Sequence, residues 1–213
     1  MENLREWHKE RMMERTVKAL LSNYFDAHFF TDRTSLLESI MYHVYPGMTI
    51  GIGGSLSIRG IGLLENLAQI DVEVLDHWKQ GLTKEDIDVI RLAQLTCDLF
   101  LSSANAITEK GDIVNIDGSG NRVNAMTFGP KKVIIIAGYN KITPDISSAL
   151  DRIKRIAAPL NAKRLNMPLP CAETGYCHDC KVEARICRIT SIIQRRPIGT
   201  NISVYLINEE LGL

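Results

Sequence analysis

Short apolar runs alternate along the chain with segments whose apolar residues recur every three or four positions. The run at residues 133–137 is unbroken and mostly β-branched, which is typical of a strand buried on both faces of a parallel sheet. Residues 4–24 instead show a helical period, with charged residues between the apolar positions. Repeated strand–helix units predict a three-layer α/β/α domain with a mostly parallel sheet, in which ligands bind at the carboxyl ends of the strands.

The same pattern places the individual elements. Strands are expected at residues 25–30, 48–52, 72–75, 99–103, 133–137 and 202–207, and a β-hairpin at residues 107–109 and 113–116. Helices are expected at residues 33–43, at 57–67, from a cap at Thr83 to about 95, and from Pro144, as the first helical position, to about 158. Residues 1–24 form an amphipathic helix that lies across the domain or against a second copy in a homodimer. Residues 25–213 form one domain.

Composition narrows the classes of partner. The 213 residues are 45% apolar and carry 25 Lys plus Arg against 25 Asp plus Glu, which leaves no net charge to attract nucleic acid or an anionic membrane. The first fifteen residues are rich in charge and lack the apolar core of a secretory signal, and no apolar run is long enough to span a bilayer. We therefore expect a cytoplasmic protein whose partners include neither nucleic acid nor membrane.

A glycine-rich loop follows the strand at residues 48–52. Gly53, Gly54 and Ser55 precede a predicted helix, so that the loop backbone, the free N–H groups of the helix and the Ser55 hydroxyl are able to contact an anion. The loop is neither a P-loop nor a dinucleotide fingerprint, because it lacks Gly-Lys-Ser/Thr and the third glycine spacing. A tight turn that binds nothing is the alternative; we favour the anion contact.

A polar segment at residues 102–123 surrounds the hairpin, and Asn140 and Lys141 follow the strand at residues 133–137. Arg122 offers a planar fork for a carboxylate or phosphate, Lys141 adds a point charge, and Asp117 is a candidate base. Each of these residues, taken alone, is more often a solvated charge or part of a turn. As a set located beyond strand ends, they favour a pocket for a small anionic metabolite.

The ordered motifs SSANAITEKGDIVNIDGSGNRV and GPKKVIIIAGYNKI, preceded by GIGGS, resemble those of the LUD domain family of lactate-utilisation proteins. The resemblance covers roughly residues 36–158. It implies a fold similar to ribose-phosphate isomerase, glucosamine-phosphate deaminase and coenzyme A transferases, and a role beside iron–sulfur proteins in the oxidation of lactate to pyruvate. Carried over to this sequence, the pocket residues are Gly53, Gly54, Ser55, Asn105, Asp117, Asn121, Arg122, Asn140 and Lys141, with Asp117, Arg122 and Lys141 as the catalytic candidates.

Four of the five cysteines lie within residues 171–187, with the spacing C-x5-C-x2-C-x6-C. Cys171, Cys177, Cys180 and Cys187 are therefore expected to bind a metal, because four thiolates suit either tetrahedral zinc or an iron–sulfur cluster. The resemblance favours a [4Fe–4S] cluster slightly over zinc. A dithiol redox pair and four ordinary thiols are weaker alternatives. The best-known lactate-utilisation proteins lack this segment, so their role is not transferred unchanged.

Two functions remain open. In the first, the protein binds a small anionic metabolite and takes part in organic-acid or redox metabolism, as part of a lactate oxidation system or as an isomerase- or transferase-like enzyme. In the second, it is a non-catalytic subunit or sensor that docks to an iron–sulfur protein partner and holds a structural zinc.

Overall fold

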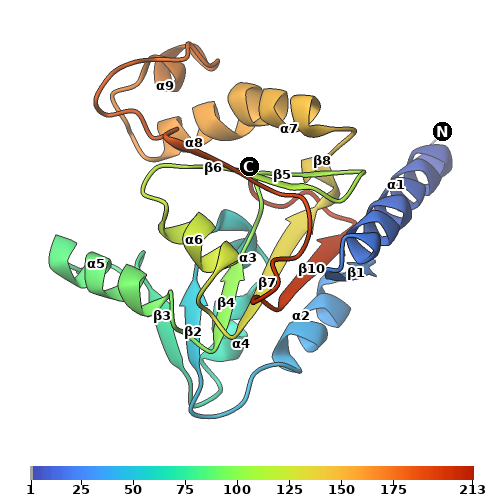
Figure 1. Ribbon diagram of the computed structural model, residues 1–213, viewed down its shortest axis with the longest axis horizontal. Coiled ribbons are helices and arrows are strands. Elements are labelled where there is room, and N and C mark those ends of the chain that lie inside the picture. The colour runs from blue at the N-terminus through green and yellow to red at the C-terminus, as the bar shows by residue number, and fades with distance from the viewer. Residues whose placement is uncertain (1) are drawn as a thin grey trace.

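The computed structural model describes residues 2–213, with no side-chain description for Glu2 (Figure 1). The helices are α1 (Glu2–Ser22), α2 (Arg33–Met41), α3 (Leu56–Gly60), α4 (Leu63–Leu67), α5 (Lys84–Ala93), α6 (Asn121–Thr127), the 3₁₀ turn η1 (Tyr139–Lys141), α7 (Ile146–Arg152), the π-helical segment η2 (Ile153–Ala157), α8 (Ala158–Arg164) and α9 (Pro170–Thr174). The strands are β1 (Asp26–Phe30), β2 (Thr49–Ile52), β3 (Glu73–Asp76), β4 (Leu99–Ser102), β5 (Ala106–Thr108), β6 (Ile113–Asp117), β7 (Lys132–Gly138), β8 (Ile142–Thr143), β9 (Ile189–Ile193) and β10 (Ile202–Ile207).

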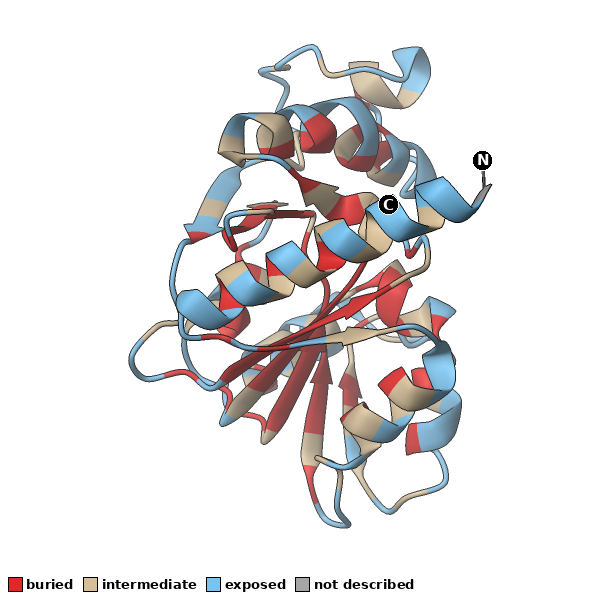
Figure 2. Ribbon diagram, turned by 90° about the vertical axis from the view of Figure 1, so that its right-hand side faces the viewer, coloured by how far each residue is buried: buried red, intermediate tan, exposed pale blue. Residues whose placement is uncertain are grey.

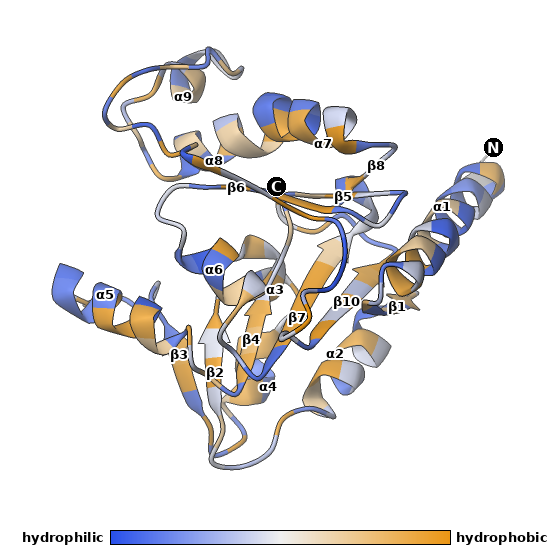
Figure 3. Cartoon of the chain, in the orientation of Figure 1, coloured by the Kyte–Doolittle hydropathy of each residue, from blue (hydrophilic) through white to orange (hydrophobic). Residues whose placement is uncertain are grey.

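Six parallel strands form the main sheet, in the order β1-β10-β7-β4-β2-β3. Successive side chains of β7 enter two apolar cores, because neighbours in a strand point to opposite faces. Ile134 and Ile136 pack with residues of α2, α3 and α4, whereas Val133 and Ile135 pack with residues of α1, α5 and α6. Figure 2 shows the central strands buried along their length and Figure 3 shows their apolar character. The predicted three-layer α/β/α architecture with a mostly parallel sheet is confirmed.

A second, four-stranded sheet lies beyond the carboxyl ends of the main sheet, in the order β8-β5-β6-β9 (Figure 1). The predicted hairpin is present as the antiparallel pair β5–β6, in which Ala106 faces Val114. The segments α7 and η2 cover this sheet through a small core that includes Ala149 and Ile153. The sequence did not predict β9, because most of its residues are exposed and its strand pattern is short. This sheet and its helices form a roof over the strand tips.

One predicted helix is divided by a glycine. The helix expected at residues 57–67 is two short helices, α3 and α4, because Gly62 adopts a left-handed conformation with φ of 75° just before α4. That change of direction turns the chain between α3 and α4. The expectation of one continuous helix is therefore wrong at this position.

The helix expected at residues 144–158 starts later and extends further. Asp145 is its cap and accepts a 2.8 Å hydrogen bond from the Ser148 N–H, so Pro144 precedes the cap and is not the first helical residue. Beyond α7 the helical path continues through η2 and α8 to Arg164. Pro159 lacks an N–H and its ring crowds the carbonyl one turn back, which accounts for the wider π-helical turn at η2.

The N-terminal helix α1 lies across the domain, as expected (Figure 2). Met13 and Leu20 are fully buried in the core beside the main sheet, and Arg15 forms a 2.8 Å ion pair with Glu109 of the β5–β6 hairpin. Trp7, on the same helix, is 57% exposed. No helix within residues 2–213 has the length and apolar character needed to cross a bilayer.

Candidate functional site

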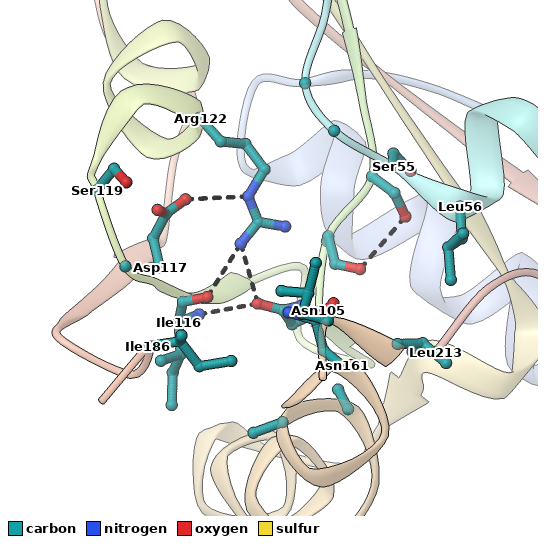
Figure 4. Close-up of a pocket in the computed structure, with 18 of the residues that line it drawn as sticks. Ser55, Leu56, Asn105, Ile116, Asp117, Ser119, Arg122, Asn161, Ile186 and Leu213 are labelled. Atoms are coloured by element: carbon teal, nitrogen blue, oxygen red, sulfur yellow. Dashed lines mark hydrogen bonds and ion pairs between the residues drawn. The ribbon is translucent and has the colours of Figure 1, made fainter. Parts of the chain in front are cut away.

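A cavity of about 380 Å³ lies between the carboxyl ends of the main-sheet strands and the helical roof (Figure 4). One wall is formed by the segments that follow β2, β3, β4, β6 and β7. Residues of η2 and α8 form the opposite wall, and Ile186 and Cys187 close one side. Among the described residues its lining holds four basic side chains, Arg91, Arg122, Lys141 and Arg164, and one acidic side chain, Asp117. The cavity therefore has the electrostatic character of an anion site.

The glycine loop after β2 lets the backbone pass close to β4. A β-carbon at Gly53 would lie 2.6 Å from Ser102 Oγ, and Gly54 has a positive φ of 61°. Ser55 caps α3 by accepting a 3.3 Å hydrogen bond from the Ile58 N–H. This hydroxyl oxygen is occupied as the cap of α3, and α3 is only a single short turn, so the start of this helix is a poor anion site. The main contribution of the loop is to shape the wall of the cavity.

Lys141 is the most deeply buried cation in the cavity. Its side chain follows β7, only 4% of the residue is exposed, and Nζ donates 2.9 Å hydrogen bonds to the hydroxyls of Ser57 and Ser103. Within residues 2–213 no carboxylate lies within ion-pair distance of this ammonium. Burial, together with the charges of Arg152 and Arg122, lowers the pKa of Lys141 to about 7.

Arg122 is held in place by three acceptors. Its Nε donates to Asp117 Oδ2 at 3.1 Å, and its Nη2 donates to Asn105 Oδ1 and to the Ile116 carbonyl, each at 3.1 Å (Figure 4). Asp117 Oδ1 accepts from the Gly120 N–H at 3.0 Å. Both oxygens of Asp117 are thus engaged, and the Nη1 group of Arg122 remains available to a ligand.

The cavity brings together eight of the nine pocket residues expected from the sequence: Gly53, Gly54, Ser55, Asn105, Asp117, Asn121, Arg122 and Lys141. Asn140 lies outside the lining. Its Oδ1 accepts from the Leu211 N–H at 3.1 Å, and its carbonyl accepts from Arg152 Nε at 2.8 Å. Asn140 therefore anchors the C-terminal segment and a buried arginine that lies behind the cavity.

Among the residues of the lining that sequence reasoning missed, four have cationic or aromatic side chains: His77, Trp78, Arg91 and Arg164. His77 and Trp78 directly follow β3, so the rule that polar groups collect at strand ends could have found them. The two arginines belong to α5 and to the end of α8, and no motif marks them. Only the folding of the roof onto the strand tips brings all four to one cavity.

The segment that contains Cys171, Cys177, Cys180 and Cys187, here called the cysteine segment, projects beyond the roof (Figure 1). Its one regular element is α9. Asp179 has a left-handed φ of 47°, and its N–H donates a 3.4 Å hydrogen bond to Cys177 Sγ. Burial raises the pKa of both Cys171 and Cys187, and the other cysteines of the segment act in the same direction, whereas the charge of Arg185 lowers the pKa of Cys187.

A single arginine organises this segment. Arg185 donates through Nε to the Cys187 carbonyl at 2.6 Å, through Nη1 to the Cys180 carbonyl at 2.7 Å, and through Nη2 to Asp179 at 2.9 Å. No group of three or more Cys, His, Asp or Glu side chains within residues 2–213 is arranged to hold a metal ion. That the four sulfurs converge on one centre therefore stays a prediction. Cys97, outside the segment, is buried in the core as expected, and burial raises its pKa to about 11.

Comparison with known proteins identifies the family but not an activity. The LUD domain family matches residues 13–207, and no curated protein matches the chain. The chain is similar to a DUF162 family protein from Deinococcus radiodurans, at 11% identity and a TM-score of 0.54, over 93% of this chain and 98% of that one. At this identity the likeness shows a shared fold.

Two further solved structures match in part. These are eIF2B beta from Chaetomium thermophilum (14% identity, TM-score 0.37, 55% of this chain and 44% of that one) and ribose 5-phosphate isomerase from Plasmodium falciparum (16%, 0.35, 53% and 52%). Their scores are too low to support an argument about function. The family match spans nearly the whole chain, from α1 to β10. The chain therefore belongs to the LUD domain family.

Proposed function

We propose that this LUD domain binds a small anionic metabolite in the cavity and acts in organic-acid or redox metabolism. The observation that carries the proposal is the state of Lys141: a buried amine with two hydroxyl partners and no neutralising carboxylate among the described residues. An ammonium has three donors, so one remains for a ligand. A bound carboxylate or phosphate would supply the charge partner that the protein does not provide.

Arg122 supports the same assignment. Its planar guanidinium is held by Asp117, Asn105 and the Ile116 carbonyl. The remaining donors of Arg122 are therefore offered to a ligand in one orientation. Asp117 was a candidate base from its sequence context. Because both of its oxygens already accept hydrogen bonds, its geometry favours a positioning role toward Arg122 over proton transfer.

We further propose that Cys171, Cys177, Cys180 and Cys187 bind a [4Fe–4S] cluster or a zinc ion. Three observations support this donor set: the clustering of the four cysteines within residues 171–187, the N–H donated to Cys177 Sγ, and the cationic Arg185 beside the segment. A cluster would supply one-electron transfer, and zinc would brace the segment. Cys187 also lines the cavity, so either metal would lie close to the bound metabolite.

One observation favours the alternative of a subunit or sensor that docks to an iron–sulfur partner. Tyr176 and Val182 are exposed apolar residues within the cysteine segment, which is the part of the molecule that projects furthest from the main sheet (Figure 3). Exposed apolar side chains beside a redox centre suit a docking surface. This alternative predicts copurification with a partner and no turnover by the isolated chain.

Anion binding is tested by calorimetric titration with lactate, pyruvate and inorganic phosphate. Lys141→Met and Arg122→Gln should each weaken binding at least about tenfold, because each removes a charged donor. Lys132→Met is the matched control: Lys132 is a half-buried lysine at the opposite end of the same strand, where it donates to Ser203. Normal binding by both cavity variants would refute the anion site.

The metal is tested by anaerobic purification with a visible spectrum and metal analysis. A brown protein with iron and sulfide supports the cluster, and a colourless protein with one zinc supports the structural site. A protein that contains neither, even after reconstitution with iron and sulfide or with zinc, would refute the metal proposal and leave the anion proposal standing.

A further inference from the structure

The cavity has a second cationic end, which we call the distal end and define as His77, Trp78, Arg91 and Arg164. The Arg164 guanidinium lies 4.6 Å from the centre of the Trp78 ring, which orients the guanidinium through a cation–π contact. Its side-chain partner is Asn161 Oδ1, and among the described residues no carboxylate forms an ion pair with it. Arg164 is therefore an exposed cation at the edge of the cavity that no carboxylate among the described residues neutralises.

Arg91 has donors without acceptors. Its Nε is buried and has no hydrogen-bond partner within residues 2–213, and its one ion-pair contact is a long 3.6 Å approach to Asp88, a mostly exposed carboxylate. A buried donor left without an acceptor costs about 1–3 kcal/mol. An acceptor supplied by a ligand would remove that cost.

His77 lies at the same end. Gln94 Nε2 lies 3.1 Å from His77 Nδ1 and also donates to the carbonyls of Ile52 and Leu75. The other ring nitrogen, His77 Nε2, faces the glycine loop, since a β-carbon at Gly54 would lie 3.1 Å from it. Burial lowers the pKa of His77 and the charge of Arg91 lowers it further, which keeps the ring neutral near pH 7.

The charges divide into two groups across the cavity. Lys141 donates to Ser57 and Ser103, and Arg122 donates to Asp117 and Asn105. Arg164 instead lies over the Trp78 ring, and Arg91 belongs to α5, whose C-cap residue Gln94 contacts the adjacent His77. Arg59 Cζ lies 5.1 Å from the centre of the same Trp78 ring. Arg59 is itself neutralised by Asp76 at 2.7 Å. The cavity thus has one cationic end at Lys141 and Arg122 and another at Arg91 and Arg164.

We infer that the distal end binds a second anionic group of the same ligand, so that the metabolite is a dianion with a carboxylate at Lys141 and Arg122 and a further carboxylate or phosphate at Arg91 and Arg164. This inference rests on the proposed function and specifies its substrate class. A ligand with one charge would leave the distal donors without acceptors, and a cavity of about 380 Å³ has room for a metabolite of several carbons.

The test compares ligands of matched length by calorimetry at pH 7: butyrate against succinate, and glycerate against 3-phosphoglycerate. At least one dianion should bind about tenfold or more tightly than its monoanionic counterpart, and the better of the two identifies the distal group as carboxylate or phosphate. Arg164→Gln should remove most of that advantage, because it should weaken binding of the dianion much more than binding of the monoanion. Lys163→Gln, an exposed neighbour on α8, removes the same charge and should change neither affinity.

Fluorescence supplies an independent readout, because the chain has two tryptophans and Trp7→Phe leaves Trp78 alone to report on the distal end. Dianions should change its emission more than monoanions. If monoanions and dianions bind equally, or a dianion binds without changing that emission, the inference is overturned while the proposed function stands. If no anion of the panel binds, the proposed function itself fails.

Discussion

The cavity and the cysteine segment are built in different ways. Lys141 follows a strand of the main sheet and Arg122 lies on α6, which packs against that sheet, and both have fixed hydrogen-bond partners and little exposure. The cysteine segment has one short helix, is half-buried or exposed, and depends on Arg185 for its internal contacts. A site preorganised by a core needs no ligand to keep its shape, whereas a segment without a core needs a cross-link such as a metal.

The largest expected effect comes from removing the metal that we propose for the cysteine segment. In the protein purified with its metal, Cys177→Ser with Cys180→Ser should abolish metal binding, and amide exchange in the cysteine segment should accelerate by about 100-fold or more, because local opening would no longer break metal bonds. Hydrogen exchange with mass spectrometry measures both regions, and strands β7 and β10 should keep their protection. Equal exchange in the variant and the parent protein would contradict the contrast between the cavity and the cysteine segment.

Stability should depend on pH through Lys141. Its pKa is about 7 in the folded protein and near 10.5 when unfolded, so between these values the unfolded chain binds more protons and the free energy of unfolding rises with pH. Below pH 7 both states are protonated and this contribution is constant. From pH 7 to 9 the rise should be about 2 kcal/mol, and Lys141→Met should remove it. Urea denaturation at several pH values tests this, and an unchanged pH profile in the variant would count against a buried neutral amine.

Anion affinity should also depend on the protonation of Lys141, but it should fall, not rise, with increasing pH. A carboxylate prefers the ammonium form, so binding should weaken as the pH rises through 7 and should be accompanied by proton uptake at pH 8. Calorimetry in buffers of different ionisation enthalpy measures that uptake. Binding without proton exchange would place the ligand away from Lys141.

Asp117→Asn tests whether this carboxylate positions Arg122. The substitution removes the charge partner of a largely buried arginine and should lower the free energy of unfolding by about 3 kcal/mol. Because Arg122 keeps Asn105 and the Ile116 carbonyl as partners, anion affinity should fall, but by less than in Arg122→Gln. A large loss of affinity, with stability unchanged, would instead favour a direct role for Asp117 toward the ligand.

The smallest effect is expected far from the cavity. Thr83 caps α5 in a reciprocal capping box with Asp86, so Thr83→Ala should cost about 1 kcal/mol of stability. Ligand affinity should be unaffected, although Arg91 lies on the same helix, because the cap is at the other end. A matching loss of affinity would show that α5 as a whole positions the distal end.

The sequence predicted the main sheet well, because long β-branched runs such as β7 read as buried strands in any context. Of the roof sheet it predicted the β5–β6 hairpin but not β9, which is mostly exposed. It also did not predict the π-helical path of η2 before Pro159, which depends on local accommodation. Most of the pocket residues that were predicted from the ordered motifs line the cavity. Arg91 and Arg164 could not be found, because ordinary helix positions become site residues only through tertiary packing. Asn140 was assigned to the pocket but has backbone partners elsewhere.

One connection between the cavity and the cysteine segment has a consequence for regulation. Only a single residue separates Cys187 from β9, whose Ile189 pairs with Asp117, and the Arg188 N–H donates to the Asp117 carbonyl at 2.9 Å. Asp117 in turn holds Arg122. Occupants of the cysteine segment and of the cavity would thus be coupled through a few covalent and hydrogen bonds. If a metal or its oxidation state changes the affinity for the metabolite, the metabolite must change the affinity for the metal, or its reduction potential, by the same free energy.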